Sequence, residues 1–157
     1  MNMDIKLGQG IGEVKFGMTR AEVVSILGEP SEKEVLPPFD GELGGSEAWH
    51  YDTIELSASF DEEEGFKLCS LAASSTDSLF EGIDLIGLSQ EEVLQQIEIL
   101  GLGDVEIETI AYEEGEEQIV ASIPEVSLNL WFEDGHLSEI QWGPFWDEEE
   151  EEYIWPE

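Results

Sequence analysis

Residues 16–30 read FGMTRAEVVSILGEP, and residues 86–101 read IGLSQEEVLQQIEILG, so one short pattern occurs twice in a chain of 157 residues. In both stretches a large apolar residue precedes Thr19 or Ser89, and a Glu follows three positions later. Ser/Thr-x-x-Glu is a capping box, and the apolar residue before it packs on one inside the first turn. The pattern therefore predicts two helices that begin after Thr19 and Ser89. Gly28 and Gly101 predict their ends.

The segments that follow the two predicted helices also match. Residues 53–60 and 126–132 alternate apolar and polar side chains, which is typical of a strand with one buried face. Each segment continues into an acidic turn and a second strand, and Asp134-Gly135 is a good two-residue hairpin turn of type I′. The sequence thus predicts an internal repeat with an offset of 70 residues, in the order helix and then antiparallel meander.

We therefore expect the α+β class, with two tandem helix-plus-antiparallel-meander repeats. One helix on three or four strands makes a thin core, so two such units should pack side by side. The expected result is a broad sheet with the helices packed on one face. The expected divisions are residues 1–76 for the first repeat, 77–143 for the second, and 144–157 for an acidic, aromatic C-terminal tail.

The helix start GEVKFGMTRAEVVSILGEP, followed by a meander and then repeated at 83–101, resembles the superfamily that joins beta-lactamase inhibitor proteins with small outer-membrane lipoproteins of the SmpA/OmlA type. The resemblance implies the repeat architecture and a habit of binding proteins on the sheet face. The resemblance does not imply that the target of this chain is a beta-lactamase. The lipoproteins have a signal peptide and a lipidated Cys, the secreted inhibitors have disulfide pairs, and this chain has only Cys69.

Charge is the strongest global signal. The chain has 39 acidic residues, five Lys or Arg and a formal net charge of −34, and no Lys or Arg follows Lys67. Such a field argues against nucleic acid and anionic membranes as partners and favours a basic protein, which it would steer inward. A single Cys, no long apolar run and no basic segment before an apolar one at the N-terminus lead us to expect a cytoplasmic protein without a signal peptide.

Residues that could carry catalysis are few. His50 and His136 have no nucleophile-elbow Ser or Cys beside them in the sequence, and Cys69 lies on an alternating strand where it fills a core. The acidic runs lack the spacing of a calcium loop. We therefore expect no enzyme activity, no cofactor and no metal site.

These observations favour a non-enzymatic inhibitor, of the immunity or antitoxin type, that blocks a basic protein such as a toxin nuclease. Two alternatives remain open. One is an acidic or halophilic housekeeping domain without an inhibitory role, and the other is a small-molecule-binding domain that uses the concavity between the repeats. The partner's identity and the oligomeric state do not follow from the sequence.

An aromatic patch ringed by acids is the expected binding surface, because aromatic side chains supply contact area and carboxylates supply steering. Alternation puts Trp131 on the side of its strand opposite Leu128, Leu130 and Phe132. The expected members of the patch are Trp49, Tyr51, Trp131, Glu133, Asp134, Glu139 and Trp142. The tail 144–157 either covers the sheet or adds an acidic, aromatic recognition segment.

Overall fold

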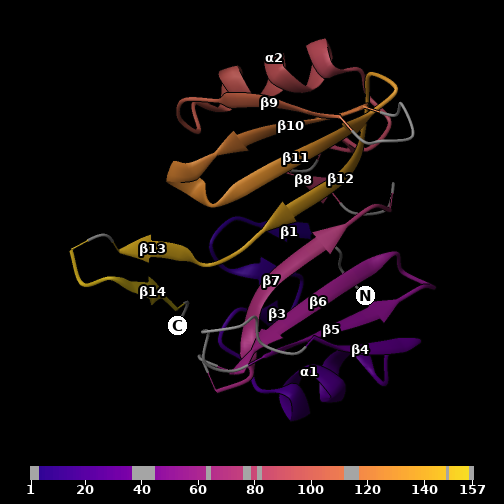
Figure 1. Cartoon of the computed structure of the whole chain (residues 1–157), viewed down its shortest axis with the longest axis vertical. Helices are drawn as coiled ribbons and strands as arrows, with labels where there is room; N and C mark the ends of the chain where they lie inside the picture. The colour runs from indigo at the N-terminus through magenta and orange to yellow at the C-terminus, as the bar shows by residue number, and fades with distance from the viewer. Residues whose placement is uncertain are drawn as a thin grey trace.

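The structure is a computed structural model that describes residues 4–36, 45–62, 65–75, 79–80, 83–111, 117–147 and 149–155. In these residues the elements follow one another along the chain as shown in Figure 1. They are β1 (Asp4–Lys6), β2 (Gly10–Ile11), β3 (Val14–Lys15), α1 (Arg20–Leu27), β4 (Glu32–Leu36), β5 (Ser46–Tyr51), β6 (Leu56–Asp61), β7 (Lys67–Ala73), β8 (Leu79–Phe80), α2 (Gln90–Leu100), β9 (Glu106–Ala111), β10 (Glu117–Ile123), a 3-10 turn (Pro124–Val126), β11 (Leu128–Glu133), β12 (His136–Trp142), β13 (Phe145–Asp147) and β14 (Glu152–Ile154).

Both predicted helix boundaries are confirmed. The Thr19 Oγ1 accepts the Glu22 backbone N–H at 3.2 Å, and the Glu22 carboxylate accepts the Thr19 backbone N–H at 3.2 Å, which completes the capping box of α1. Ser89 caps α2 in the same way by accepting the Glu92 N–H at 3.2 Å. Gly28 and Gly101 are the C-caps. These side chains satisfy amide groups that a helix leaves without internal partners.

Eight antiparallel strands form the large sheet, in the order β4-β5-β6-β7-β12-β11-β10-β9. It consists of two four-stranded meanders that meet where β7 pairs with β12, with Ala73 opposite Ile140. Within the second meander Glu133 is paired with His136, so the turn between them has two residues. Asp134 and Gly135 have φ angles of 52° and 79°, as a type I′ turn requires, and the predicted hairpin is confirmed.

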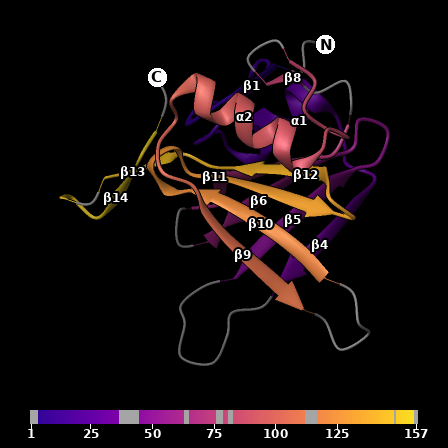
Figure 2. The same ribbon diagram turned by 90° about the horizontal axis from the view of Figure 1, so that it is seen from above.

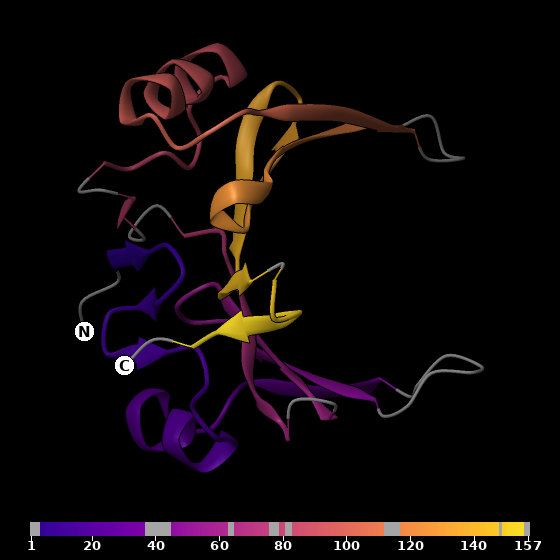
Figure 3. The same cartoon turned by 90° about the vertical axis from the view of Figure 1, so that its left-hand side faces the viewer.

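A smaller sheet, in the order β3-β2-β1-β8, lies with the two helices on one side of the large sheet (Figure 3). We call the side of the large sheet that faces them the inner face. Every second side chain of the large strands is buried there, as for Leu56, Ala58 and Phe60 of β6. The Trp142 indole N–H donates to the Gly10 carbonyl at 3.1 Å and so ties β12 to the small sheet.

The expected fold class is wrong. Strands make up 50% of the structure and helices 18%, so the protein is mostly β rather than α+β. It does not have the helix-plus-meander repeat arrangement with a layer of helices on one face. The helices span only 8 and 11 residues, which is too short to cover eight strands. The small sheet supplies cover instead.

The C-terminal residues form a hairpin of β13 and β14 that extends away from the rest of the molecule (Figure 2). The sequence left open whether residues 144–157 cover the sheet. In the described part of this segment, the hairpin makes a separate two-stranded sheet. The expected division between residues 76 and 77 lies outside the described residues.

Candidate functional site: the outer face of the large sheet

The side of the large sheet turned away from the helices is the outer face. Figure 3 shows the sheet bending so that β4 and β5 at one end and β9 and β10 at the other extend away from the helices, which leaves the outer face concave. Alternation places small and polar side chains at its centre. Among them are Ser57, Ser59, Ala72, Asn129 and Gln141, all half-buried.

Trp131 and Glu139 are the largest features of this face. They lie directly opposite each other on β11 and β12. The Trp131 indole N–H donates to the Gln141 side-chain oxygen at 3.2 Å, so the ring is held on the surface of the sheet. Glu139 is half-buried between its neighbours, and this burial raises the pKa of its carboxyl group. A desolvated carboxylate is stabilised by a cation brought close to it.

His50 lies on the same face, on β5. Its Nδ1 is 2.8 Å from the Ser57 Oγ, and its Nε2 is 3.8 Å from a Glu34 carboxylate oxygen. The Ser–His–Glu row resembles the order of groups in a charge-assisted nucleophile, but the ion pair is at the outer limit of such contacts. Ser57 also lies mid-strand, where the backbone pairs with the neighbouring strands β5 and β7. The contact with Ser57 fixes the position of the imidazole ring on the sheet.

Two pockets open on the outer face and share two residues. The first has a volume of about 340 Å³ and is lined by Glu32, His50, Tyr51, Asp52, Glu55, Leu56, Ser57, Ala72, Ser74 and Glu139. The second, of about 400 Å³, is lined by Ser74, Gln118, Trp131, Glu133, Ser138 and Glu139. Because Ser74 and Glu139 belong to both, the pockets form one hollow that crosses the junction between β7 and β12. Among the described residues, no Lys or Arg lines it.

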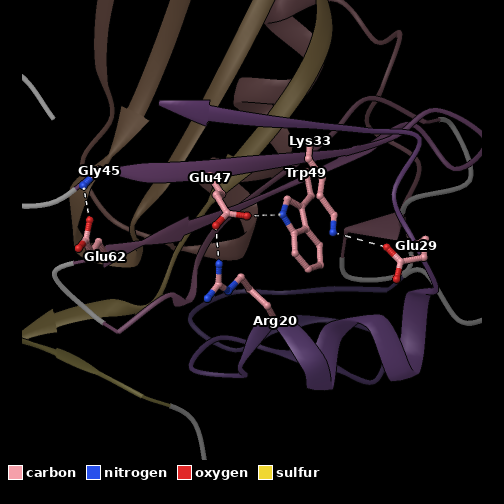
Figure 4. A network of polar contacts seen from close by, with 7 residues as sticks. All are labelled: Arg20, Glu29, Lys33, Gly45, Glu47, Trp49 and Glu62. Carbon is pink, nitrogen blue, oxygen red and sulfur yellow. Dashed lines mark hydrogen bonds and ion pairs between the residues drawn. The ribbon is translucent and has the colours of Figure 1, made fainter. Parts of the chain in front are cut away.

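The five cations of the chain are held elsewhere. Figure 4 shows Arg20 of α1 reaching the Glu47 carboxylate, which also accepts the Trp49 indole N–H at 3.1 Å. Lys33 pairs with Glu29 at 3.5 Å and lies 4.7 Å from the centre of the Trp49 ring, again on the inner side of the sheet.

The remaining cations are also away from the hollow. Lys6 donates to the Gly12 carbonyl at 3.3 Å in the small sheet, which also holds Lys15 on β3. Lys67 lies 5.5 Å from the centre of the Trp155 ring. In the described lining of the hollow, no Lys or Arg therefore offsets the carboxylates of the outer face.

The structure divides the predicted patch. Trp49, Tyr51 and Trp142 are 2%, 4% and 1% exposed, so the expectation that they present a surface is wrong. Alternation turns all three toward the inner face, where the helices and small sheet cover them. The Tyr51 hydroxyl donates to the Gly28 carbonyl at 3.0 Å. Burial, with a contribution from the nearby Glu29 charge, raises its pKa to about 12.

The other four predicted residues stay together. Trp131, Glu133 and Glu139 line the second pocket, and Asp134 is exposed in the adjoining turn. Sequence reasoning missed Gln118, Ser74 and Ser138, and it treated His50 as structural. Alternation could have placed Gln118 and His50 on this face, because both lie on strands. Ser74 lies just beyond the end of β7, and the pairing of β7 with β12 that brings it into the hollow joins segments far apart in the chain.

Comparison with known proteins gives no assignment: no protein-family profile, no curated protein and no solved structure matches this chain. Among the described residues, no helix is both long enough and apolar enough to cross a membrane. In the same part of the chain, no group of three or more His, Cys, Asp and Glu side chains is placed to hold a metal ion.

Proposed function

We propose that this chain is a protein-binding inhibitor of the immunity or antitoxin type, and that its outer face blocks a basic protein. The observation that carries the proposal is the acidic hollow of that face, which is lined by Trp131 and Glu139 and has no Lys or Arg in its described lining. The proposal places the protein in the cytoplasm, where a single half-buried Cys69 would stay reduced.

Electrostatics would set the rate of such an encounter. A concave surface of one sign raises the local concentration of an oppositely charged partner and speeds association. The net charge of −34 extends this attraction well beyond the hollow. A toxin that binds nucleic acid needs a basic active site, so an acidic concave surface would compete for the same groups that hold phosphate.

Contacts in the hollow would set the lifetime of the complex. Trp131 offers a rigid, half-buried ring of the kind that anchors interfaces, and small neighbours such as Ser57 and Ala72 let a partner's side chain approach the sheet. Burial disfavours the charged form of Glu139 in the free protein. An Arg or Lys of the partner beside Glu139 would stabilise that charged form.

Affinity capture from the native cell at moderate salt tests the proposal, with matched variants as bait. The wild-type chain and Glu98→Gln, which removes one exposed charge from α2 on the other side of the molecule, should both retain the same basic protein. Trp131→Ala combined with Glu139→Gln should lose most of it. The purified partner's own activity should then fall on addition of the wild-type chain.

Two results would count against this function. One is the recovery of no basic protein by any bait, which would favour an acidic domain without a blocking role. The other is a partner retained equally by the outer-face variant and by Glu98→Gln, which would place binding elsewhere on the surface.

A further inference from the structure

The hairpin of β13 and β14 is the one described element that leaves the compact body (Figures 1 and 2). It follows β12 directly, after Gly143 and Pro144. Glu139 and Gln141 of β12 lie on the outer face, and Glu139 lines the hollow. The hairpin therefore continues the chain directly from the strand that crosses the hollow. A two-stranded ribbon in water is marginally stable by itself, so its order must come from contacts at its base and along its length.

Two aromatic side chains fix the base of the hairpin against glycines of the body. A Cβ built on Gly8 would lie 2.4 Å from the Phe145 ring, so the ring packs where only glycine leaves room. A Cβ on Gly17 would lie 3.2 Å from the Trp155 ring. Lys67 approaches that ring from β7. The hairpin is thereby clamped at the start of β13 and just beyond the end of β14.

A row of aromatic rings stiffens the hairpin between these points. Trp146 is opposite Tyr153, and their rings meet edge to face at 5.0 Å between centroids. Tyr153 in turn contacts Trp155 at 5.5 Å. An arm that is ordered in advance loses less conformational entropy when it binds, so it suits recognition better than a loose tail does.

The arm nevertheless exposes apolar groups on both of its faces. Trp146 is 48% exposed, and Ile154, which pairs with Phe145 on the opposite face, is 50% exposed. The contact with Tyr153 covers only part of the Trp146 ring, and about half of its surface stays in water. A large exposed aromatic side chain on an ordered arm is typical of a contact that a partner completes.

Charge identifies the kind of partner. Glu149, Glu150 and Glu151 lie in the turn of the hairpin, between Asp147 of β13 and Glu152 of β14, and no Lys or Arg occurs anywhere after Lys67. A second copy of the chain would bring an identical acidic turn and a net charge of −34 against it, so self-association through the arm is disfavoured. A basic protein is the occupant that both the apolar groups and the acids fit.

We propose that the β13–β14 hairpin is a docking arm that grips the basic partner outside the hollow, with Trp146 and Ile154 as contacts and the acidic turn as the steering element. This inference rests on the proposed function and adds a second, separate contact to it. The outer face and the arm then hold one partner at two places, and each contributes to the lifetime of the complex.

Site-specific photo-crosslinking of the full chain in the native cell tests both parts separately. A photoreactive residue is placed at 131 on the outer face, at 146 on the arm, and at 99 on α2 as the control. The same basic protein should be captured from positions 131 and 146 and not from 99. Capture from 131 alone overturns the arm and leaves the proposed function standing.

The other crosslinking results are equally decisive. Capture of the partner from 146 alone supports the arm and overturns the assignment of the outer face. Capture of a second copy of this chain from 146 overturns the arm as a site for a basic partner. No capture from 131 or 146 overturns both proposals.

Kinetics with the identified, purified partner then measure what the arm contributes. Trp146→Ser should raise the dissociation rate roughly ten-fold, as expected for an interface anchor. Ile154→Ser, on the other face of the arm, should act in the same direction. If neither change alters dissociation, Trp146 and Ile154 are not contacts and the arm is overturned.

A charge variant keeps the test valid if Trp146→Ser unravels the hairpin. Glu149→Gln, Glu150→Gln and Glu151→Gln together leave the aromatic row intact and should slow association several-fold at low salt. The matched control makes the same changes at Glu13, Glu91 and Glu98, which are exposed on the small-sheet and helix side. Equal slowing by both triple variants would mean that the acids of the arm have no local role and would overturn it.

Discussion

A single carboxylate shows how the outer face departs from an ordinary acidic surface. Glu139 is half-buried at the junction of the two pockets, and burial is the cause of its raised pKa. Burial holds this carboxyl where a negative charge is costly. A sequence with so many Glu residues gives no sign of which one is special. Only its place opposite Trp131 distinguishes it.

Replacing Glu139 by Gln should therefore stabilise the free protein at neutral pH. A carboxyl whose pKa is higher in the folded state contributes its full stability below the unfolded value and loses it as pH rises through the folded value. The wild type should lose stability from this group as pH rises above the ordinary Glu pKa of about 4.3 and through the raised folded-state value, whereas the neutral amide should not. Urea unfolding at several pH values should show the gain from Glu139→Gln at pH 7 and its disappearance near pH 4.

The exposed Glu98→Gln is the control, because it removes the same formal charge from the surface of α2 without affecting a buried group. It should change stability less at pH 7 and with a weaker pH dependence. A loss of stability in Glu139→Gln at pH 7 would mean that the ionised carboxylate makes contacts worth more than its desolvation costs.

At the scale of elements, local chemistry was predictable and long-range pairing was not. The caps Thr19 and Ser89, the C-cap glycines and the Asp134-Gly135 turn each depend on a few adjacent residues, and all were read correctly. The fold class was wrong because the first 15 residues form short strands with little alternation. Of these strands, β1 pairs with β8 across more than 60 residues of chain, which no local pattern reveals.

The contrast between local patterns and long-range pairing also explains which residues of the candidate site were placed correctly from the sequence. Trp131 was placed on the correct side of its strand because alternation within one strand decides it. Trp49, Tyr51 and Trp142 were misplaced because the period of two says only that residues share a face, not which face is covered. Tyr51 is covered at Gly28, the C-cap of α1, and Trp142 at Gly10 in the small sheet, which was not expected.

Removing the cap of α1 tests how much this short helix depends on its first turn. Thr19→Ala deletes the oxygen that accepts the Glu22 N–H and should cost about 1 kcal/mol of unfolding free energy, the usual value of a cap. Ser25→Ala, in the exposed part of the same helix, should be neutral or slightly stabilising, because Ala is the better helix former. Equal effects of the two changes in urea unfolding would show that the capping box adds nothing beyond propensity.

At the scale of the whole molecule, one electrostatic field has two consequences that should respond to salt in opposite directions. The charge of −34 repels itself within the folded chain, and the same charge attracts a basic partner from a distance. Salt screens both effects, since the Debye length falls from about 10 Å at 0.1 M to about 3 Å at 1 M. The short contacts at Trp131 and in the core are screened far less.

Adding NaCl should therefore raise the melting temperature of the free chain and lower the association rate with its partner. Most of the stability gain should come below about 0.5 M, where the Debye length has already dropped under the spacing of neighbouring surface charges. KCl should match NaCl if screening is the cause, and the dissociation rate should change little. A surface that steers a partner must lose its effect on the association rate once its field is screened. Stability that keeps rising into molar salt, with an unchanged association rate, would instead indicate an acidic surface adapted to salt.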